Sequence, residues 1–157
     1  MEVLLNFAYT GSIYWDVMEN FFGFLKDANF FGLDEAKEEG IKILISDLNP
    51  LIAIEAYTLS REVNSASLKS KSKKVILENI EVISSTDDFS KLNFESLKDI
   101  LSNIPPVDPT EKIIEGILKW IESDLSTRKS YLQDILGTIQ IWLADINMVV
   151  RISLKHK

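Results

Sequence analysis

Apolar residues recur every three or four positions along most of the chain, a spacing that is typical of amphipathic helices. The clearest apolar stripe lies near the start and consists of Val17, Phe21, Phe24, Leu25, Ala28 and Phe31. We expect Asp16 to cap this helix and Gly32 to end it. Asp34 should open the next helix, which reaches Leu48. A shorter helix that ends near Gly11 should precede both.

Residues 47–83, in the middle of the chain, predict two consecutive helices that form an αα-hairpin. Asn49 and Pro50 mark the start, because asparagine accepts a capping hydrogen bond and proline has the φ of a first helical position. One face of the first helix consists of Ile52, Ala56, Leu59 and Val63, and its flanks carry Leu51, Ile54 and Tyr57. Because these flanks are apolar, we expect the helix to pack on more than one side. The second helix should keep one apolar face from Leu68 to Ile83.

The second half of the chain predicts more helices, separated by polar or proline-rich breaks. Phe89 and Leu92 should return to the core, and Asn93 should cap a helix over residues 94–104. A non-helical connector is predicted by the three prolines Pro105, Pro106 and Pro109. Gly116 lies in the middle of the next helix, where glycine costs about 1 kcal/mol relative to alanine. We therefore expect close packing against a neighbour at that position.

Composition narrows the classes of protein and ligand that the chain fits. The 157 residues have a net charge of −7 and include no cysteine, so disulfides, thiolate zinc sites and thiol nucleophiles are excluded. The negative charge argues against duplex DNA or an anionic membrane as a partner. The sequence lacks an apolar run of the roughly 20 residues that span a bilayer and lacks a secretory signal pattern. These features predict a soluble intracellular protein of the cytoplasm, with the nucleus as a second location.

Candidate catalytic and metal-binding residues are sparse. His156 is the only histidine and lies one residue from the end, so we interpret it as part of a solvated tail. The acidic pairs Glu38 with Glu39 and Asp87 with Asp88 could be an acid and a base, or cation ligands. Neighbouring side chains on a helix point about 100° apart, so solvated helix faces and caps explain these pairs better. We predict no enzyme activity, no cofactor and no metal.

One basic segment, Ser67 to Lys74, stands out from the acidic background. Its lysines could bind phosphate groups or RNA, and its serines could be modified. The lysines spread around more than half of a helix, and no aromatic side chains alternate with them for base stacking. We therefore interpret the segment as a solvated helix face and expect no nucleic-acid partner.

Several segments together resemble the BTB-BACK proteins of the kelch-like type. In the central hairpin the resemblance is carried by Leu48, Pro50, Ala56, Leu68, Ile76 to Asn79 and Val82. Before it, LLNFAYTGSI and DANFFGLDEAKEEGIKIL resemble late segments of a BTB domain. After it, residues 111–141 resemble the second part of a BACK domain through Trp120, Asp124, Arg128 and Leu132. The glycine and aromatic pattern of kelch blades does not follow in this sequence.

The resemblance implies an all-α fold, in which the last helices of a truncated BTB domain precede the helical hairpins of a BACK-like bundle. We assign residues 1–48 to a partial BTB domain, 49–141 to a BACK domain that includes the 3-box helical pair, and 142–157 to a divergent tail. The early BTB strands and helices that carry the family's homodimer interface and its cullin-binding hydrophobic-x-Glu motif are missing. Either the sequence is truncated or the chain is a reduced family member. Phe22 and Phe30 lie off the apolar stripe, where the missing sheet would cover them, so we expect both to be exposed.

In this family the 3-box helps to bind cullin-3, the scaffold of a ubiquitin ligase. The resemblance therefore implies a non-enzymatic adaptor whose partners are a cullin-3 type scaffold and an unknown substrate protein. Homo-oligomers would be weakened by the missing BTB part, and neither nucleic acid nor membrane is expected as a partner. The predicted partner-binding residues are Tyr9, Phe22, Phe30, Leu33, Leu51, Ile54 and Tyr57. For the flank of Leu51, Ile54 and Tyr57, packing between domains is the alternative to a cullin-facing groove. The alternative function is a scaffold or oligomerisation module that has no ligase role and works through exposed phenylalanines.

Overall fold

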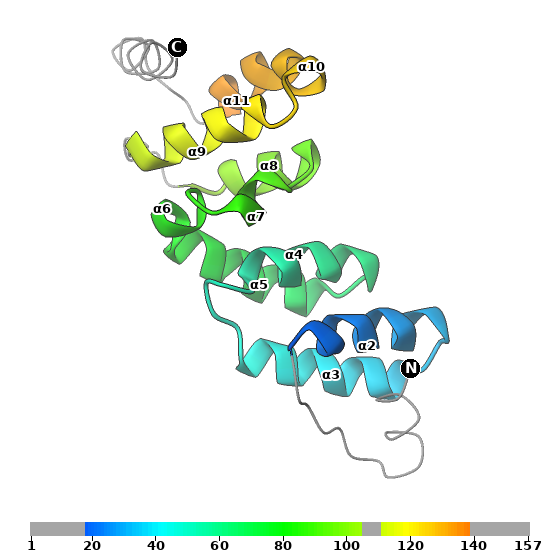
Figure 1. Cartoon of the computed structure of the whole chain (residues 1–157). Helices are drawn as coiled ribbons and strands as arrows, with labels where there is room; N and C mark the ends of the chain where they lie inside the picture. The colour runs from blue at the N-terminus through cyan, green and yellow to red at the C-terminus, as the bar shows by residue number, and fades with distance from the viewer. Residues whose placement is uncertain (1–17, 105–110, 139–157) are drawn as a thin grey trace. The chain divides into compact units, whose positions relative to one another are not determined.

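The computed structural model describes residues 18–104 and 111–138, and every element within these ranges is helical (Figure 1). The elements are α2 (Met18–Phe30), α3 (Asp34–Ser46), α4 (Ala53–Glu62), α5 (Ala66–Glu78), α6 (Ile80–Ile83), α7 (Asp87–Ser90), α8 (Phe94–Leu101), α9 (Glu111–Glu122), α10 (Leu125–Arg128), the 3₁₀ turn η1 (Lys129–Tyr131) and α11 (Leu132–Thr138). The predicted all-α fold is confirmed. The helix expected before Gly11, the cap at Asp16 and the proline connector lie outside the described residues.

The chain divides into two compact units, residues 1–74 and 75–157, with the boundary inside α5. In the first unit α2 contacts both α3 and α4, so its apolar surface must serve two neighbours. The core consists of Phe21, Phe22, Phe24, Leu25, Ala28, Ala36, Ile41, Leu44, Ala56, Leu59, Val63 and Leu68. Apolar residues on three helices and at the start of a fourth thus share one core.

A glycine turn joins α2 to α3. Gly32 has a φ of +68°, in the left-handed region that glycine adopts without a steric penalty. The N–H of Leu33 donates to the carbonyl of Ala28 at 2.9 Å, and the N–H of Gly32 donates to that of Asn29 at 3.3 Å. This pair of bonds is the Schellman pattern, which satisfies carbonyls at a helix end. The predicted end of the first long helix at Gly32 and start of the second at Asp34 are confirmed.

The predicted cap at Asn49 is wrong, because α4 begins three residues later than expected. The side-chain oxygen of Asn49 accepts a hydrogen bond from the N–H of Leu51 at 3.0 Å. A turn therefore forms before Ala53, and Ile52 precedes the helix without a side-chain cap. Asparagine favours such local turns for the same reason that it favours caps, since its short amide reaches the nearby backbone.

The predicted hairpin of α4 and α5 is confirmed, and α4 is buried on more than one side, as expected. Ile54 and Tyr57 on one flank are buried, as are Leu59 and Val63 on the face that joins the core. Between the helices, Asn64 has a positive φ of 52°, and the Ser65 hydroxyl oxygen accepts from the N–H of Leu68 at 3.2 Å. A left-handed residue and a capping serine therefore reverse the chain.

The expectation of one continuous helix from Leu68 to Ile83 is wrong. Helix α5 ends at Glu78, and α6 is a separate single turn. The side-chain amide of Asn79 donates to the carbonyl of Val75 at 2.9 Å, four residues earlier. This side chain takes over a carbonyl that the helix would otherwise bond, which accounts for the interruption.

In the second unit, α9 packs on the short helices before it. The predicted returns of Phe89 and Leu92 to the core are confirmed, since both are buried. The indole N–H of Trp120 donates to the carbonyl of Leu92 at 2.6 Å. The guanidinium of Arg128 lies 4.2 Å from the centre of the Trp120 ring and donates to the carbonyl of Ser90 at 2.9 Å. Arg128 therefore joins α10 to α7 and α9.

Two further local predictions in this unit are confirmed. The side-chain oxygen of Asn93 accepts from the N–H of Ser96 at 2.8 Å, so it caps α8, although this helix ends at Leu101 rather than Ile104. A Cβ atom on Gly116 would lie 2.7 Å from the Cβ of Ser84, so the close packing expected at this glycine is present. Among the described helices, none has the length and apolar character of a membrane span.

Candidate partner-binding surface

The seven predicted partner-binding residues differ in their exposure to solvent. Tyr9 lies outside the described residues. Phe30, Leu33 and Leu51 are exposed, at 83%, 42% and 85% of their surface, whereas Phe22, Ile54 and Tyr57 are buried. The structure thus separates the set into three surface residues and three interior ones. Their role in binding a partner stays a prediction.

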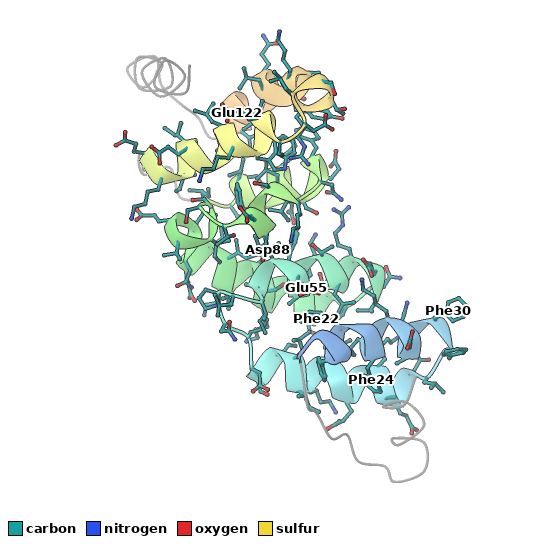
Figure 2. All side chains as sticks on the ribbon, in the orientation of Figure 1. Phe22, Phe24, Phe30, Glu55, Asp88 and Glu122 are labelled. Carbon is teal, nitrogen blue, oxygen red and sulfur yellow. The ribbon has the colours of Figure 1, made fainter. Side chains whose placement is uncertain are left out.

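The expected exposure of Phe22 is wrong, because only 4% of its surface is accessible. It belongs to the core of the first unit together with Phe21 and Phe24 on the same helix. Helix α2 packs against two neighbours, so a residue beside the main stripe is covered as well. Figure 2 shows Phe30 at the far end of α2 from Phe22, pointing outward.

Ile54 and Tyr57 do not line an open groove. Both side chains are buried, and the Tyr57 ring is fully covered. The ammonium group of Lys69, on α5, lies 5.9 Å from the centre of that ring, within reach of a cation–π interaction. The burial of these two side chains does not fit the cullin-facing groove expected for this flank, and it leaves Leu51 as the one exposed member.

Three exposed apolar residues gather at the turn between α2 and α3, and we call them the α2–α3 tip: Phe30, Phe31 and Leu33. The two phenyl rings meet edge to face with centroids 5.2 Å apart. This arrangement is a favourable one for aromatic pairs. The rings therefore cover part of each other and still present an apolar surface to solvent.

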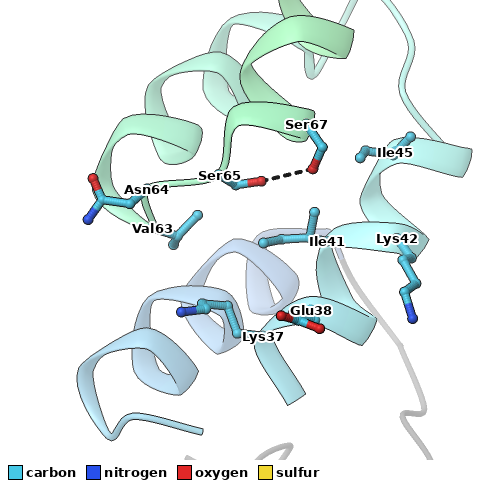
Figure 3. A pocket seen from close by; sticks show the side chains of 9 residues that line it. All are labelled: Lys37, Glu38, Ile41, Lys42, Ile45, Val63, Asn64, Ser65 and Ser67. Atoms are coloured by element: carbon cyan, nitrogen blue, oxygen red, sulfur yellow. Dashed lines mark hydrogen bonds between the residues drawn. The ribbon is translucent and has the colours of Figure 1, made fainter. Parts of the chain in front are cut away.

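A pocket of about 480 Å³ lies between α3 and the turn that joins α4 to α5 (Figure 3). We call it the α3 pocket, and its lining residues are Lys37, Glu38, Ile41, Lys42, Ile45, Val63, Asn64, Ser65 and Ser67. The aliphatic members form the apolar part, and charged and hydroxyl side chains surround it. Such a mixture suits one apolar side chain of a partner together with polar contacts to its backbone.

Sequence reasoning missed the α3 pocket as a set of residues, because the groove that it expected was at the flank of Leu51, Ile54 and Tyr57. The lining comes from one helix and from a turn about twenty positions later, and most of its members are polar. No local pattern marks such residues as neighbours. The Asn64 and Ser65 turn signal was the nearest available clue, because it fixes where the chain reverses beside α3.

Ionisable groups in the described residues offer little catalytic chemistry. No cluster of three His, Cys, Asp or Glu side chains there could hold a metal ion. The hydroxyl of Ser126 donates to the Asp124 carboxylate at 2.9 Å and lowers the pKa of that carboxyl below its usual value. Hydrogen bonds from Thr127 act in the same direction, so this carboxylate is a charged cap of α10.

Sequence comparisons relate the chain to kelch-like proteins. It is 25% identical over 144 residues to Kelch-like protein 25 of Xenopus laevis, which covers 91% of this chain and 24% of that relative. Over 155 residues it is 24% identical to Kelch-like protein 28 of Homo sapiens, covering 97% of this chain and 27% of that relative. Over 141 residues it is 23% identical to Kelch-like protein 38 of Homo sapiens, covering 90% of this chain and 24% of that relative. The chain spans about a quarter of the length of these relatives.

The family profile described as BACK, "BTB And C-terminal Kelch", matches residues 53–152. The match covers more than half of the chain and includes α4 to α11. It also includes residues 142–152, which the sequence analysis assigned to a divergent tail, so the domain boundaries stay predictions. The resemblance to kelch-like BTB-BACK proteins is confirmed, and the chain belongs to the BACK family.

Proposed function

We propose that the chain is a non-enzymatic adaptor that binds a cullin-3 type scaffold through its first unit. In this proposal other subunits of the ubiquitin ligase perform the chemistry, and the chain helps to bring a substrate protein to them. Membership of the BACK family and similarity to kelch-like proteins support this class of function. The α3 pocket is the observation that supports a docking site in the first unit.

The α3 pocket has the chemistry of a site for a protein segment. Ile41 is nearly buried and Ile45 is partly buried, so the apolar part of the pocket belongs to the wall of the core. Lys42 on its rim is exposed and forms an ion pair with Glu39 at 3.1 Å. A partner could therefore insert an apolar anchor and meet charged groups around it, as at many interface hot spots.

Two substitutions test this proposal. Ile45→Arg places a charged side chain in the pocket, and Lys42→Glu reverses a charge on its rim. Lys91→Glu is the matched control, because Lys91 is equally exposed and pairs with Asp88 at 2.7 Å, also three residues away. Binding of the purified N-terminal region of cullin-3 to the full chain would be measured by calorimetry.

We expect Ile45→Arg and Lys42→Glu to weaken binding by at least about tenfold and Lys91→Glu to leave it unchanged. Circular dichroism would show that each variant keeps its helices. If the wild-type chain does not bind the scaffold, the adaptor role is refuted. Equal binding by all three folded variants would refute the pocket as the docking site while leaving the role intact.

A further inference from the structure

The α2–α3 tip is a second surface, and the fold of the first unit does not account for its composition. Phe30, at the end of α2, has 83% of its surface exposed, whereas Phe24 on the same helix is buried in the core. Neither Phe30 nor Phe31 belongs to the core cluster. The two rings therefore contribute little to the stability of the folded chain, and their exposed apolar surface is available to a binding partner.

Acidic residues follow the tip along α3 and begin in the first turn of that helix. Residues 30–42 contain four acidic side chains and two lysines, which leaves two negative charges in excess. Each lysine is already paired within α3: Lys37 lies 2.8 Å from Asp34, and Lys42 lies 3.1 Å from Glu39. Glu35 and Glu38 form no ion pair among the described residues. Glu35 is the first of these unpaired carboxylates along the chain and follows Leu33 by two residues.

Favourable interactions with the helix dipole explain why acidic residues begin α3, but they do not explain the exposed rings beside them. Exposed aromatic rings beside acidic residues are complementary to a binding segment that is both apolar and basic. A docking segment with an apolar anchor would cover Phe30 and Phe31, and a positive charge next to that anchor would face Glu35. An acidic or neutral segment would cover the rings and leave this carboxylate uncompensated.

A second copy of this chain fits the tip poorly. In a two-fold dimer the same patch meets itself, so each copy would bring its tip against the other's. Asp34 and Glu35 of one copy would then approach the same carboxylates of its partner. Like charges brought together in an interface oppose association. The charge pattern therefore favours a different protein.

We propose that the α2–α3 tip binds a basic, apolar segment of another protein, in which an aromatic or long aliphatic anchor is flanked by lysine or arginine. The anchor packs on Phe30 and Phe31, and the flanking cation pairs with Glu35. This surface is distinct from the α3 pocket, whose lining includes none of these three residues. The proposal does not depend on binding to a cullin scaffold.

A random peptide library displayed on phage tests the proposal with the full-length chain. Selection on the wild type, with counter-selection on Phe30→Ser/Phe31→Ser, should enrich peptides that carry an aromatic residue, leucine or methionine next to lysine or arginine. A synthetic copy of the most enriched peptide would then be measured by fluorescence anisotropy. We expect the double serine variant to weaken its binding by at least about tenfold.

The charge requirement has its own matched pair of variants. Glu35→Lys and Glu122→Lys change the net charge equally, and both residues are exposed on helices. We expect only Glu35→Lys to weaken peptide binding, and we expect added salt to weaken wild-type binding. Three results would overturn the proposal: no peptide distinguishes the wild type from the serine variant, the enriched peptides lack basic residues, or the two lysine variants behave alike. Light scattering that shows tip-dependent self-association would also overturn it, because the occupant would then be a second copy.

Discussion

Replacement of Gly116 by alanine should destabilise the second unit, although alanine is the better helix former. A Cβ atom at this position would lie 2.7 Å from the Cβ of Ser84 and 2.9 Å from its carbonyl carbon, and it would also contact the carbonyl oxygen. These separations are shorter than atoms can tolerate. The obstacle is mainly backbone, so it cannot rotate away as the end of a flexible side chain would, and either α9 or the end of α6 must move.

Three contributions determine the change in the free energy of unfolding: one favours alanine and two oppose it. Alanine adds about 1 kcal/mol of helix propensity relative to glycine. Overpacking of this kind typically costs about 1–3 kcal/mol. The displaced Ser84 hydroxyl also donates to the carbonyl of Lys112 at 3.2 Å, a bond whose loss would cost about 0.5–1.5 kcal/mol. The free energy of unfolding should therefore fall by about 0.5–3.5 kcal/mol.

Urea unfolding followed by circular dichroism measures this change on the full-length chain. Gly137→Ala is the control in the same unit, because Gly137 is exposed on α11 and its Cβ would meet nothing within 4 Å. The control should be unchanged or more stable by up to about 1 kcal/mol. If Gly116→Ala were as stable as the wild type, the reasoning from the Ser84 contact would be refuted.

Two further predictions concern single residues. Phe22→Ala should lower the free energy of unfolding by about 3–5 kcal/mol because the ring is in the core, whereas Phe30→Ala should change it by less than about 0.5 kcal/mol. The urea midpoints of the two variants test this difference. Equal losses of stability would contradict the assigned burial. The Ser126 hydroxyl lowers the pKa of the Asp124 carboxyl in the folded chain. The ionised carboxylate therefore stabilises the fold fully above its unfolded pKa of about 3.9, and this stabilisation is lost as the pH falls through the lower folded pKa. The stability difference between wild type and Asp124→Asn should therefore shrink below about pH 4 in a series of thermal melts, and a difference that grows with acid would have the wrong sign.

Periodicity in the sequence predicted the helices well because each helix buries a stripe whose spacing is set by helix geometry alone. Gly32, Asn93 and Gly116 were also interpreted correctly, since their effects act on the neighbouring backbone or on a close contact that needs a small residue. Local signals of this kind do not require knowledge of the tertiary neighbours.

Features that depend on a second neighbour were not predictable in the same way. Phe22 is buried because α2 packs against two helices, and the periodic stripe reports only one of these contacts. Asn49 and Asn79 each have a side chain that can cap a helix, form a turn or take over a helical carbonyl. The sequence names the residue, but tertiary structure selects among these outcomes. The α3 pocket depends in the same way on where the α4–α5 turn lies beside α3.

The glycine turn between α2 and α3 also bears on how fast and how tightly a partner could dock. Its left-handed Gly32 and two backbone hydrogen bonds immobilise the loop during folding, before any partner arrives. Ordering a flexible loop would otherwise cost about 1–2 kcal/mol per residue of backbone entropy at the moment of association. A side chain larger than hydrogen at this position would strain the loop and reintroduce that entropic penalty, even though the anchoring rings themselves were untouched.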